Sequence, residues 1–310
     1  MSSPGHIGNY RLARAAGRLL SPAGGRGRLT VFCYHQVLEV FDPLRPGEPD
    51  EKKFRNDVEL IDRVFSVMPF GEAAERLASG SLPKRAACIT FDDGYANNHE
   101  LAAPILRAAG VPATFFIAGG AVDIGVMWND LVIEAVAHSG SSEQVRALPE
   151  TLSHLKYRPL AERWDAAERI YRETVGTELP RLMMTRDMVA GLARQGFEIG
   201  GHTINHPILK ELTDEEARRE IEQCADWVED VTGTRATSFA YPNGVPGLDY
   251  EHRHESMVRD SGFAAAASTQ WAVAGPGTDA FSIPRIGPWW RQGRALTLGL
   301  CRSYLKSYLT

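Results

Sequence analysis

The chain has 310 residues, 44% of them hydrophobic, which is enough for one large α/β domain or two smaller ones. The formal net charge of −5 and the absence of a polybasic run argue against a nucleic-acid partner. No apolar stretch approaches the roughly 18 residues of a transmembrane helix, and the N-terminus lacks the long apolar segment of a signal peptide. Four scattered cysteines without metal-like spacing indicate buried thiols in a reducing compartment, so we expect a cytoplasmic protein.

The N-terminus is predicted to be a basic arm over residues 1–27, made of an amphipathic helix at 8–20 and a flexible joint. Such a helix can dock on the rest of the protein or lie peripherally on the inner face of a membrane, and both alternatives stay open. A buried strand over 28–37 follows and contains Tyr34 and His35. A helix near 51–66 has apolar residues at helical spacing.

The next elements predict parallel strands. A strand over 86–91 leads into Asp92 and Asp93, then a helix ends near Gly110, and another strand covers 113–118. This is a βαβ unit, whose two strands are parallel. Residues 121–184 are rich in helical patterns without an intervening strand. We interpret them as a helical insertion in a single domain that spans 28–310.

After the insertion the alternation of strands and helices resumes. A helix capped by Thr185 ends at Gly196, and Thr213 with Glu216 forms a capping box for a helix over 214–232. Further elements are predicted in this order: a strand at 197–200, a strand and turn at 238–244, a helix at 249–261, strands at 263–269 and 281–288, and a helix near 291–308. Repeated β-then-α units predict an α/β barrel or a doubly wound sheet, with the chemistry at the carboxyl ends of the strands.

Polar residues with metal-binding potential follow two of these strands. Asp92 and Asp93 end one strand, and His202 and His206 follow another after two glycines. Two imidazoles and one carboxylate leave an open position on a divalent metal, as in catalytic zinc sites. Two satisfied loop histidines are the plainer alternative. The HExxH pattern of zinc proteases is excluded because Thr203 stands in the glutamate position.

A two-histidine, one-carboxylate set also suits iron oxygenases, but those sites usually lie on β-sandwich scaffolds rather than on alternating strands and helices. A second carboxylate beside the ligand favours hydrolysis, because a base must deprotonate the attacking water.

The chain resembles the polysaccharide deacetylases, which include chitin deacetylases and NodB-like carbohydrate esterases. The resemblance rests on "TFDDGY" at 90–95, "GGHTINHP" at 200–207 and "FAYPNG" at 239–244. It implies a distorted β/α barrel with fewer than eight strands, and metal-dependent removal of an N-acetyl group from a sugar, in bacterial polysaccharide or glycoconjugate biosynthesis. By this resemblance Asp92 is the catalytic base, and the metal, Zn²⁺ or else Co²⁺ or Ni²⁺, is bound by Asp93, His202 and His206.

The third motif departs from the family pattern R-x-P-Y-G. Ala240 replaces the arginine that steers the base, and Arg285 after a later strand is our candidate substitute, with an ordinary ion pair as the rival interpretation. Asn243 replaces the tyrosine, but its backbone N–H can still stabilise an oxyanion. Beside it, Tyr241 is a candidate for substrate binding. Trp289 is another, because it can stack on a sugar ring, although it can equally pack in the core.

The usual late-strand histidine of the family is missing, since no histidine follows residue 254. His35 is our candidate for the acid that protonates the leaving amine, and a subgroup of the family carries such a Tyr-His pair on its first strand. A structural histidine bonded to a carbonyl is the rival. Two other functions stay open: a hydrolase of non-sugar amides on the same scaffold, and a non-catalytic glycan-binding module.

Overall fold

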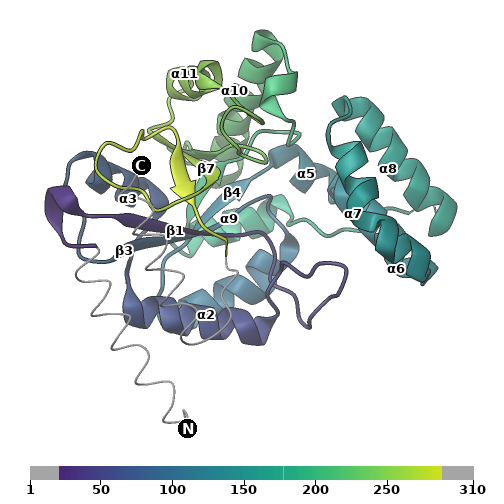
Figure 1. The fold of residues 1–310 in the computed structure, drawn as a ribbon, viewed down its shortest axis with the longest axis horizontal. Coiled ribbons are helices and arrows are strands. Elements are labelled where there is room, and N and C mark those ends of the chain that lie inside the picture. Colours follow the sequence, from purple (N-terminus) through teal and green to yellow (C-terminus); the bar gives the residue numbers. More distant parts are fainter. Residues whose placement is uncertain (1–20, 177, 288–310) are drawn as a thin grey trace, which may run out of the picture.

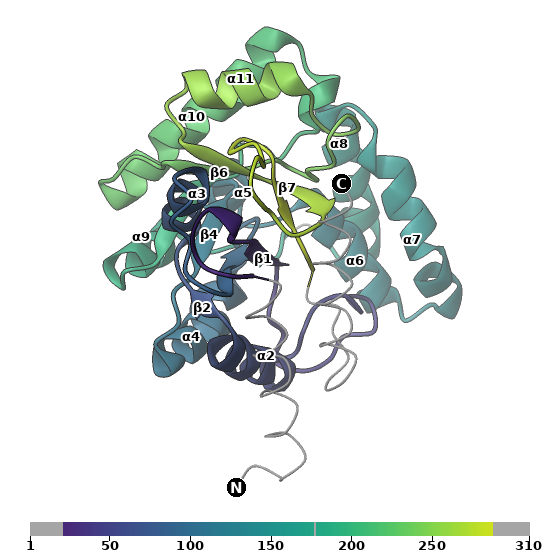
Figure 2. The ribbon, with the colours of Figure 1, turned by 60° about the vertical axis from the view of Figure 1, so that its left-hand side comes forward.

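A ring of parallel strands forms the centre of the molecule (Figures 1 and 2). The computed structural model describes residues 21–176 and 178–287. Strands β1, β3, β4, β5, β6, β7 and β8 are neighbours in that order, and the short β2 pairs beside this path with β3. Their bounds are β1 Leu29–Tyr34, β2 Ser66–Val67, β3 Ala86–Phe91, β4 Thr114–Ile117, β5 Glu198–Gly201, β6 Ser238–Ala240, β7 Ala265–Trp271 and β8 Ile283–Arg285.

The ring nearly closes between the first and last strands. Phe32 of β1 forms a parallel bridge with Ile286, directly after β8, and the Cys33 N–H donates to the Ile286 carbonyl at 3.0 Å. Seven strands therefore form a barrel in which all pairings along the ring are parallel. This confirms the predicted distorted β/α barrel with fewer than eight strands. Because the strands are parallel, their carboxyl ends and the loops after them gather at one end of the barrel.

Helices surround the barrel. They are α2 Glu51–Val64, α3 Phe70–Ala78, α4 Ala103–Ala109, α5 Gly119–Ile124, α6 Trp128–Ser139, α7 Ser142–Lys156, α8 Leu160–Thr174, α9 Arg186–Arg194, α10 Asp214–Thr232 and α11 His252–Asp260. Short turns η1 Gly24–Arg26 and η3 Leu209–Glu211 and the π-helical η2 Asn98–Ala102 complete the described elements. The predicted cap at Thr185 begins α9, and the predicted capping box of Thr213 and Glu216 begins α10.

The helices α6, α7 and α8 pack together on one side of the barrel (Figure 1). They have a hydrophobic cluster of their own, which includes Leu131, Leu148 and Ala167, apart from the clusters around the barrel strands. The segment begins and ends at one place, because the Gly125 carbonyl accepts hydrogen bonds from the N–H groups of Leu182 and Met183 at 2.7 and 3.0 Å. These helices lie within the predicted insertion at 121–184.

Some boundaries differ from the predictions. The first strand ends at Tyr34 rather than at 37, so His35 begins the loop that follows β1. The elements α3 and β2 were not predicted. The predicted helices at 8–20 and 291–308, and Trp289, lie outside the described residues. No helix in the described part of the chain is long and apolar enough to cross a membrane.

Candidate active site

The turn after β3 separates the two neighbouring aspartates. The Asp92 N–H donates to the Tyr34 carbonyl at 3.0 Å, which continues the pairing of β3 with β1. Asp93 then adopts a left-handed backbone with φ of +74°, and Gly94 follows with φ of +100°. A left-handed backbone is rare outside glycine and costs free energy. The turn brings both carboxylates to the carboxyl end of the barrel, where both line one pocket.

Asp93 lies between two histidines that follow β5. Its Oδ1 atom is 3.4 Å from Nε2 of His202 and 3.3 Å from Nε2 of His206. This oxygen is buried and has no hydrogen-bond partner among the described residues. Ligand atoms of the three side chains lie within 4.8 Å of one another. Two imidazole nitrogens and a buried, unsatisfied carboxylate oxygen at this separation fit a divalent metal ion.

The protonation of the histidines agrees with this fit. Nδ1 of His202 lies 2.7 Å from the Ala240 carbonyl and donates to it, so Nε2, which lies on the side of Asp93, is the nitrogen available to a metal ion. Burial lowers the pKa of His206 to about 3, so this imidazole is neutral at neutral pH. Burial opposes the charge on Asp93, but electrostatic and hydrogen-bond interactions with His206 and His202 outweigh burial and hold its pKa below the ordinary value, so the carboxylate is charged.

The loop that carries His206 is held by a helix outside the barrel. Glu220 of α10 accepts hydrogen bonds at 2.9 Å from the backbone N–H groups of both Ile204 and Asn205. Within the loop, Thr203 and His206 adopt left-handed backbones with φ of +63° and +52°. The Thr203 hydroxyl accepts a hydrogen bond from the His206 N–H at 3.1 Å. The two histidines of the candidate metal site thus come from one short, tightly bonded turn.

Arg285, at the end of β8, binds Asp92 across the seam of the barrel. Its Nη1 and Nη2 atoms donate to the two carboxylate oxygens of Asp92 at 2.7 and 2.6 Å, and its Nε donates to the Ser268 carbonyl. Both side chains are buried, at 1% and 2% exposure. Burial alone would raise the pKa of Asp92, but the charge of Arg285 outweighs burial and lowers it. The residue predicted to replace the missing arginine therefore contacts the predicted base.

His35 also reaches this pocket. A ring nitrogen of His35 lies within 4.8 Å of both the Asp92 carboxylate and the Cys33 thiol. Burial alone would lower the pKa of His35, but the carboxylates of Asp93 and Glu48 outweigh it, so the pKa is raised. A raised pKa favours the protonated ring that a proton donor requires.

The pocket that contains these groups has a volume of about 220 Å³. Asn243 and Thr269 form one part of its wall, and the Thr269 hydroxyl donates to the Asn243 carbonyl at 2.6 Å. Asn243 has a left-handed backbone with φ of +58°. Four wall residues come from the helical insertion: Met127, Trp128, Asn129 and Arg163.

Sequence reasoning assigned no role to Arg163 or Thr269, because neither belongs to a motif. The one available signal for Arg163 was a basic residue in an insertion that follows a barrel strand.

Tyr241 lies apart from this group. Its side chain is fully buried, its hydroxyl donates to the Phe281 carbonyl at 2.9 Å, and its ring stacks on Tyr250 with centroids 3.7 Å apart. Its backbone N–H donates to the Ala267 carbonyl. The expectation that Tyr241 binds substrate is therefore corrected, because the side chain packs in the core and does not line the pocket.

Comparison with known families gives a clear result. A polysaccharide deacetylase family model matches residues 79–266, which is more than half of the chain and contains the three motifs of the pocket. The chain belongs to the polysaccharide deacetylase family. A family member of this kind is expected to hydrolyse amide bonds of acetylated glycans. The assignment to a subgroup with a Tyr-His pair on the first strand stays a prediction.

Individual relatives are distant. The putative polysaccharide deacetylase YxkH of Bacillus subtilis (strain 168) is 20% identical over 261 residues, 84% of this chain and 71% of that protein. The structure of the Streptococcus pyogenes deacetylase PplD in complex with acetate matches with a TM-score of 0.63 and 15% identity, over 90% of this chain and 99% of that one. IcaB from Ammonifex degensii matches with a TM-score of 0.61 and 18% identity, over 92% and 98%. At this identity the structures establish the shared fold.

Proposed function

We propose that this protein is a metal-dependent hydrolase that removes the N-acetyl group from an N-acetylated sugar or glycan. The observation that carries the proposal is the joint placement of two units in one pocket. One unit is a donor set of two histidines and a carboxylate, and the other is the ion pair of Asp92 with Arg285. Membership of the polysaccharide deacetylase family supports the same reaction.

Asp93, His202 and His206 would hold the metal ion, with Zn²⁺ the first candidate and Co²⁺ or Ni²⁺ alternatives. A divalent ion bound there would act as a Lewis acid toward water and the acetyl carbonyl. The fixed tautomer of His202 and the unsatisfied Oδ1 of Asp93 are the features of this chain that favour binding.

Asp92 is proposed as the base. Its lowered pKa keeps the carboxylate ionised at neutral pH, and the bidentate contact with Arg285 fixes the direction of its free lone pairs. It takes a proton from the water whose oxygen attacks the acetyl carbon. The backbone N–H of Asn243, which has no acceptor among the described residues, is proposed to donate to the carbonyl oxygen as negative charge develops there.

His35 is proposed as the acid that protonates the amine nitrogen when the carbon–nitrogen bond breaks. The products are then acetate and a protonated amino sugar. The same proposal includes a role in polysaccharide or glycoconjugate biosynthesis, which rests on the family resemblance. It also includes a cytoplasmic location, with the arm 1–27 as a potential contact to the inner face of the membrane, which rests on composition.

The direct test is acetate release from N-acetylglucosamine oligomers by the metal-loaded protein. We expect turnover that a chelator abolishes and that added Zn²⁺, Co²⁺ or Ni²⁺ restores. His206→Ala should lose bound metal and turnover together. Asp92→Asn should keep its metal and lose turnover by about 10²–10⁴-fold, the usual effect of removing a general base. If Asp92→Asn lost its metal, Asp92 would be the ligand and Asp93 the base. If the protein hydrolysed only simple amides and no acetylated sugar, it would be a hydrolase of non-sugar substrates.

His35→Ala separates the acid from the ligands. We expect this variant to keep its metal content and to lose most of its turnover on an acetamido sugar. Esters of the same acetylated sugar have a much better leaving group, so their hydrolysis should fall far less. Equal losses on ester and amide would remove the acid role and leave His35 as a structural histidine.

A further inference from the structure

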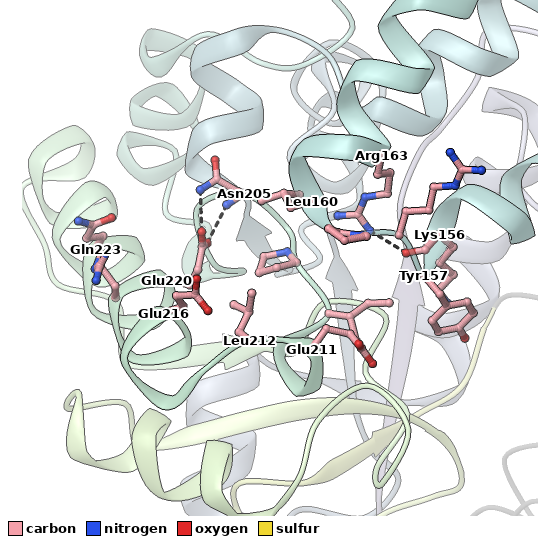
Figure 3. Close-up of a pocket in the computed structure, with 15 residues that line it drawn as sticks. Lys156, Tyr157, Leu160, Arg163, Asn205, Glu211, Leu212, Glu216, Glu220 and Gln223 are labelled. Atoms are coloured by element: carbon pink, nitrogen blue, oxygen red, sulfur yellow. Dashed lines mark hydrogen bonds between the residues drawn. The ribbon is translucent and has the colours of Figure 1, made fainter.

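Arg163 of α8 lies at the boundary of two concave regions. It lines the active-site pocket, and it also lines a neighbouring groove of about 490 Å³ between α8 and α10. We call this region the α8–α10 groove; its walls include Leu160, Pro207, Leu212 and Glu220. Figure 3 shows Arg163 on the α8 side of this groove, with Glu216 and Glu220 on the opposite side and Leu212 between them.

The guanidinium of Arg163 has no countercharge in the described part of the chain. Its side chain is buried, with 2% of the residue exposed. Nη1 donates to the Lys156 carbonyl at 3.0 Å and Nη2 to the His206 carbonyl at 3.4 Å, while the buried Nε atom has no hydrogen-bond partner. No ion pair with a described carboxylate is formed. Burial lowers its pKa to about 10, so the group stays charged at neutral pH.

A buried charge without a partner costs free energy, and proteins normally compensate it. The contrast with Arg285 is direct, because that buried guanidinium is neutralised by Asp92 through two hydrogen bonds. Arg163 instead packs over the ring of Trp128, with 5.1 Å between the guanidinium carbon and the ring centroid. One ordinary and one long hydrogen bond to carbonyl oxygens hold Arg163 in place, and they leave other N–H groups of the guanidinium for a further group.

Three carboxylates line the α8–α10 groove, those of Glu211, Glu216 and Glu220, and none of them forms an ion pair with Arg163. Both oxygens of Glu220 accept hydrogen bonds from the loop that carries His206, and Glu216 accepts from Thr213 at the start of α10. They lie on the opposite wall from Arg163 (Figure 3). The charge of Arg163 is therefore available to a ligand that spans the pocket and the groove.

We propose that Arg163 is a specificity residue that binds an oxyanion of the substrate, a carboxylate or a phosphate, carried next to the acetylated sugar. This inference rests on the proposed deacetylase function. A guanidinium offers a planar, two-pronged donor that suits both oxyanions. The substrate class is then an anionic acetylated glycan or glycoconjugate, with the acetamido sugar in the pocket and the charged neighbour at the entrance of the α8–α10 groove.

The test uses the metal-loaded full chain and three probes. They are a neutral N-acetylglucosamine tetramer, a tetrasaccharide that alternates N-acetylglucosamine with glucuronate, and UDP-N-acetylglucosamine. Binding is measured by calorimetry and acetate release in parallel. We expect one anionic probe to bind at least about tenfold more tightly than the neutral tetramer, as a charge-assisted contact predicts. The preferred anionic probe tells whether a uronate or a phosphate is the natural partner.

Arg163→Gln should remove this preference by weakening the anionic probe about tenfold or more, while the affinity for the neutral tetramer changes less than about twofold. Arg163→Lys should retain part of it. Arg172→Gln is the matched control, because Arg172 is an exposed arginine of the same helix that pairs with Glu168 outside both cavities. We expect it to leave all three affinities unchanged. Metal content is measured for every variant.

Equal affinities of the wild type for neutral and anionic probes would overturn the inference, and this comparison needs no variant to fold. So would a preference that survives in Arg163→Gln. If Arg163 only supported the His206 loop, Arg163→Gln would weaken all probes alike and lower the metal content. An anionic preference in binding without acetate release from any probe would instead count against the deacetylase function.

Discussion

Arg285 and Asp92 are both charged and buried, and each charge would be strongly destabilised there without the other. Both are at least 98% buried, and the guanidinium meets both carboxylate oxygens. Removing one partner of a buried pair leaves an uncompensated charge and costs about 3–5 kcal/mol, much more than the loss of a surface pair. The pair therefore connects the stability of the barrel to the proposed base.

Arg285→Met should keep the volume of the side chain but leave Asp92 without its partner. We expect the free energy of unfolding to fall by about 3–5 kcal/mol and turnover to fall strongly while metal stays bound. Urea unfolding and metal analysis measure both effects. Arg235→Met is the control, since Arg235 forms an exposed pair with Asp226 and should change stability by less than about 1 kcal/mol. Similar losses in the two variants would contradict this account.

The residues of the site differ in how far the sequence predicted them. The spacing of His202 and His206 and the aspartate pair indicated a metal site, the family resemblance selected Asp93 as its carboxylate, and the structure brings these three residues together. Arg285 belongs to no motif and was predicted only as a substitute for the arginine that Ala240 replaces. Tyr241 was misplaced, because alternation along β6 turns its side chain into the core. Arg163 was missed because insertions carry no motif.

Among the elements, α10 has a function besides packing. Glu220 on its inner side accepts hydrogen bonds from the backbone of Ile204 and Asn205 and so fixes the turn between the two histidines of the proposed metal site. Groups that orient metal ligands typically contribute 10–100-fold to metal affinity.

Glu220→Ala should lower metal affinity by about 10–100-fold while the protein stays folded. Competition with a chromophoric chelator measures the affinity. The control is Glu222→Ala, an exposed position on the same helix, which should leave the affinity unchanged. Unaltered metal affinity in Glu220→Ala would mean that the turn holds its shape without α10.

The helix α6 carries a buried acid with a consequence for pH. Asp130 is fully buried and neither carboxylate oxygen has a hydrogen-bond partner among the described residues, although Nη2 of Arg45 lies 3.7 Å away. Burial raises its pKa to about 7, against about 4 for an unfolded aspartate. The folded state therefore holds a proton that the unfolded state has lost, and stability falls as the pH rises from about 4 to about 7.

Asp130→Asn should remove this dependence. We expect the variant to be more stable than the wild type above pH 7, by a margin on the order of a few kcal/mol, and nearly equal to it below pH 4. Chemical unfolding across this range measures the slope. Asp62→Asn, at an exposed position of α2, serves as the control and should leave the slope unchanged. If the variant and the wild type had the same free energy of unfolding at every pH, Arg45 would be keeping Asp130 charged in the folded state.

Element boundaries were predicted where capping chemistry is local. Thr185 and the Thr213–Glu216 box mark helix starts in sequence and in structure. The two-residue β2 and the helix α3 were missed, because a short edge strand and a nine-residue helix carry too little periodic signal. The first strand was predicted too long, since buried Val37 follows His35 and Gln36 and looks like a continuation of the strand, whereas the pairing with β3 ends at Tyr34.

At the scale of the whole molecule, the chain consists of a barrel, which carries the candidate active site, and a helical layer of α6, α7 and α8, which forms part of the pocket wall. The ends of the layer meet at Gly125, whose carbonyl bonds both Leu182 and Met183. The layer also has its own hydrophobic cluster. These two facts make it separable from the barrel in principle.

Replacing residues 127–181 with a short glycine-serine linker should leave a folded barrel that still binds metal. We expect it to lose discrimination among acetylated glycans, because Trp128 and Arg163 leave the pocket wall. Circular dichroism, metal analysis and relative turnover on the probes measure these outcomes. Unchanged selectivity in a folded deletion variant would contradict the assignment of specificity to the insertion.

The left-handed backbones at the pocket lower the free energy of unfolding of this protein. Of the five described non-glycine residues with positive φ, four are Asp93, Thr203, His206 and Asn243. Each such residue costs roughly 1–3 kcal/mol unless its surroundings compensate. Selection for heat resistance alone should therefore introduce glycine at 243, where the backbone would relax and no hydrogen bond of the histidine turn would be lost. The protein thus lies away from its stability optimum at the candidate active-site pocket, and directed evolution for heat resistance would measure by how much.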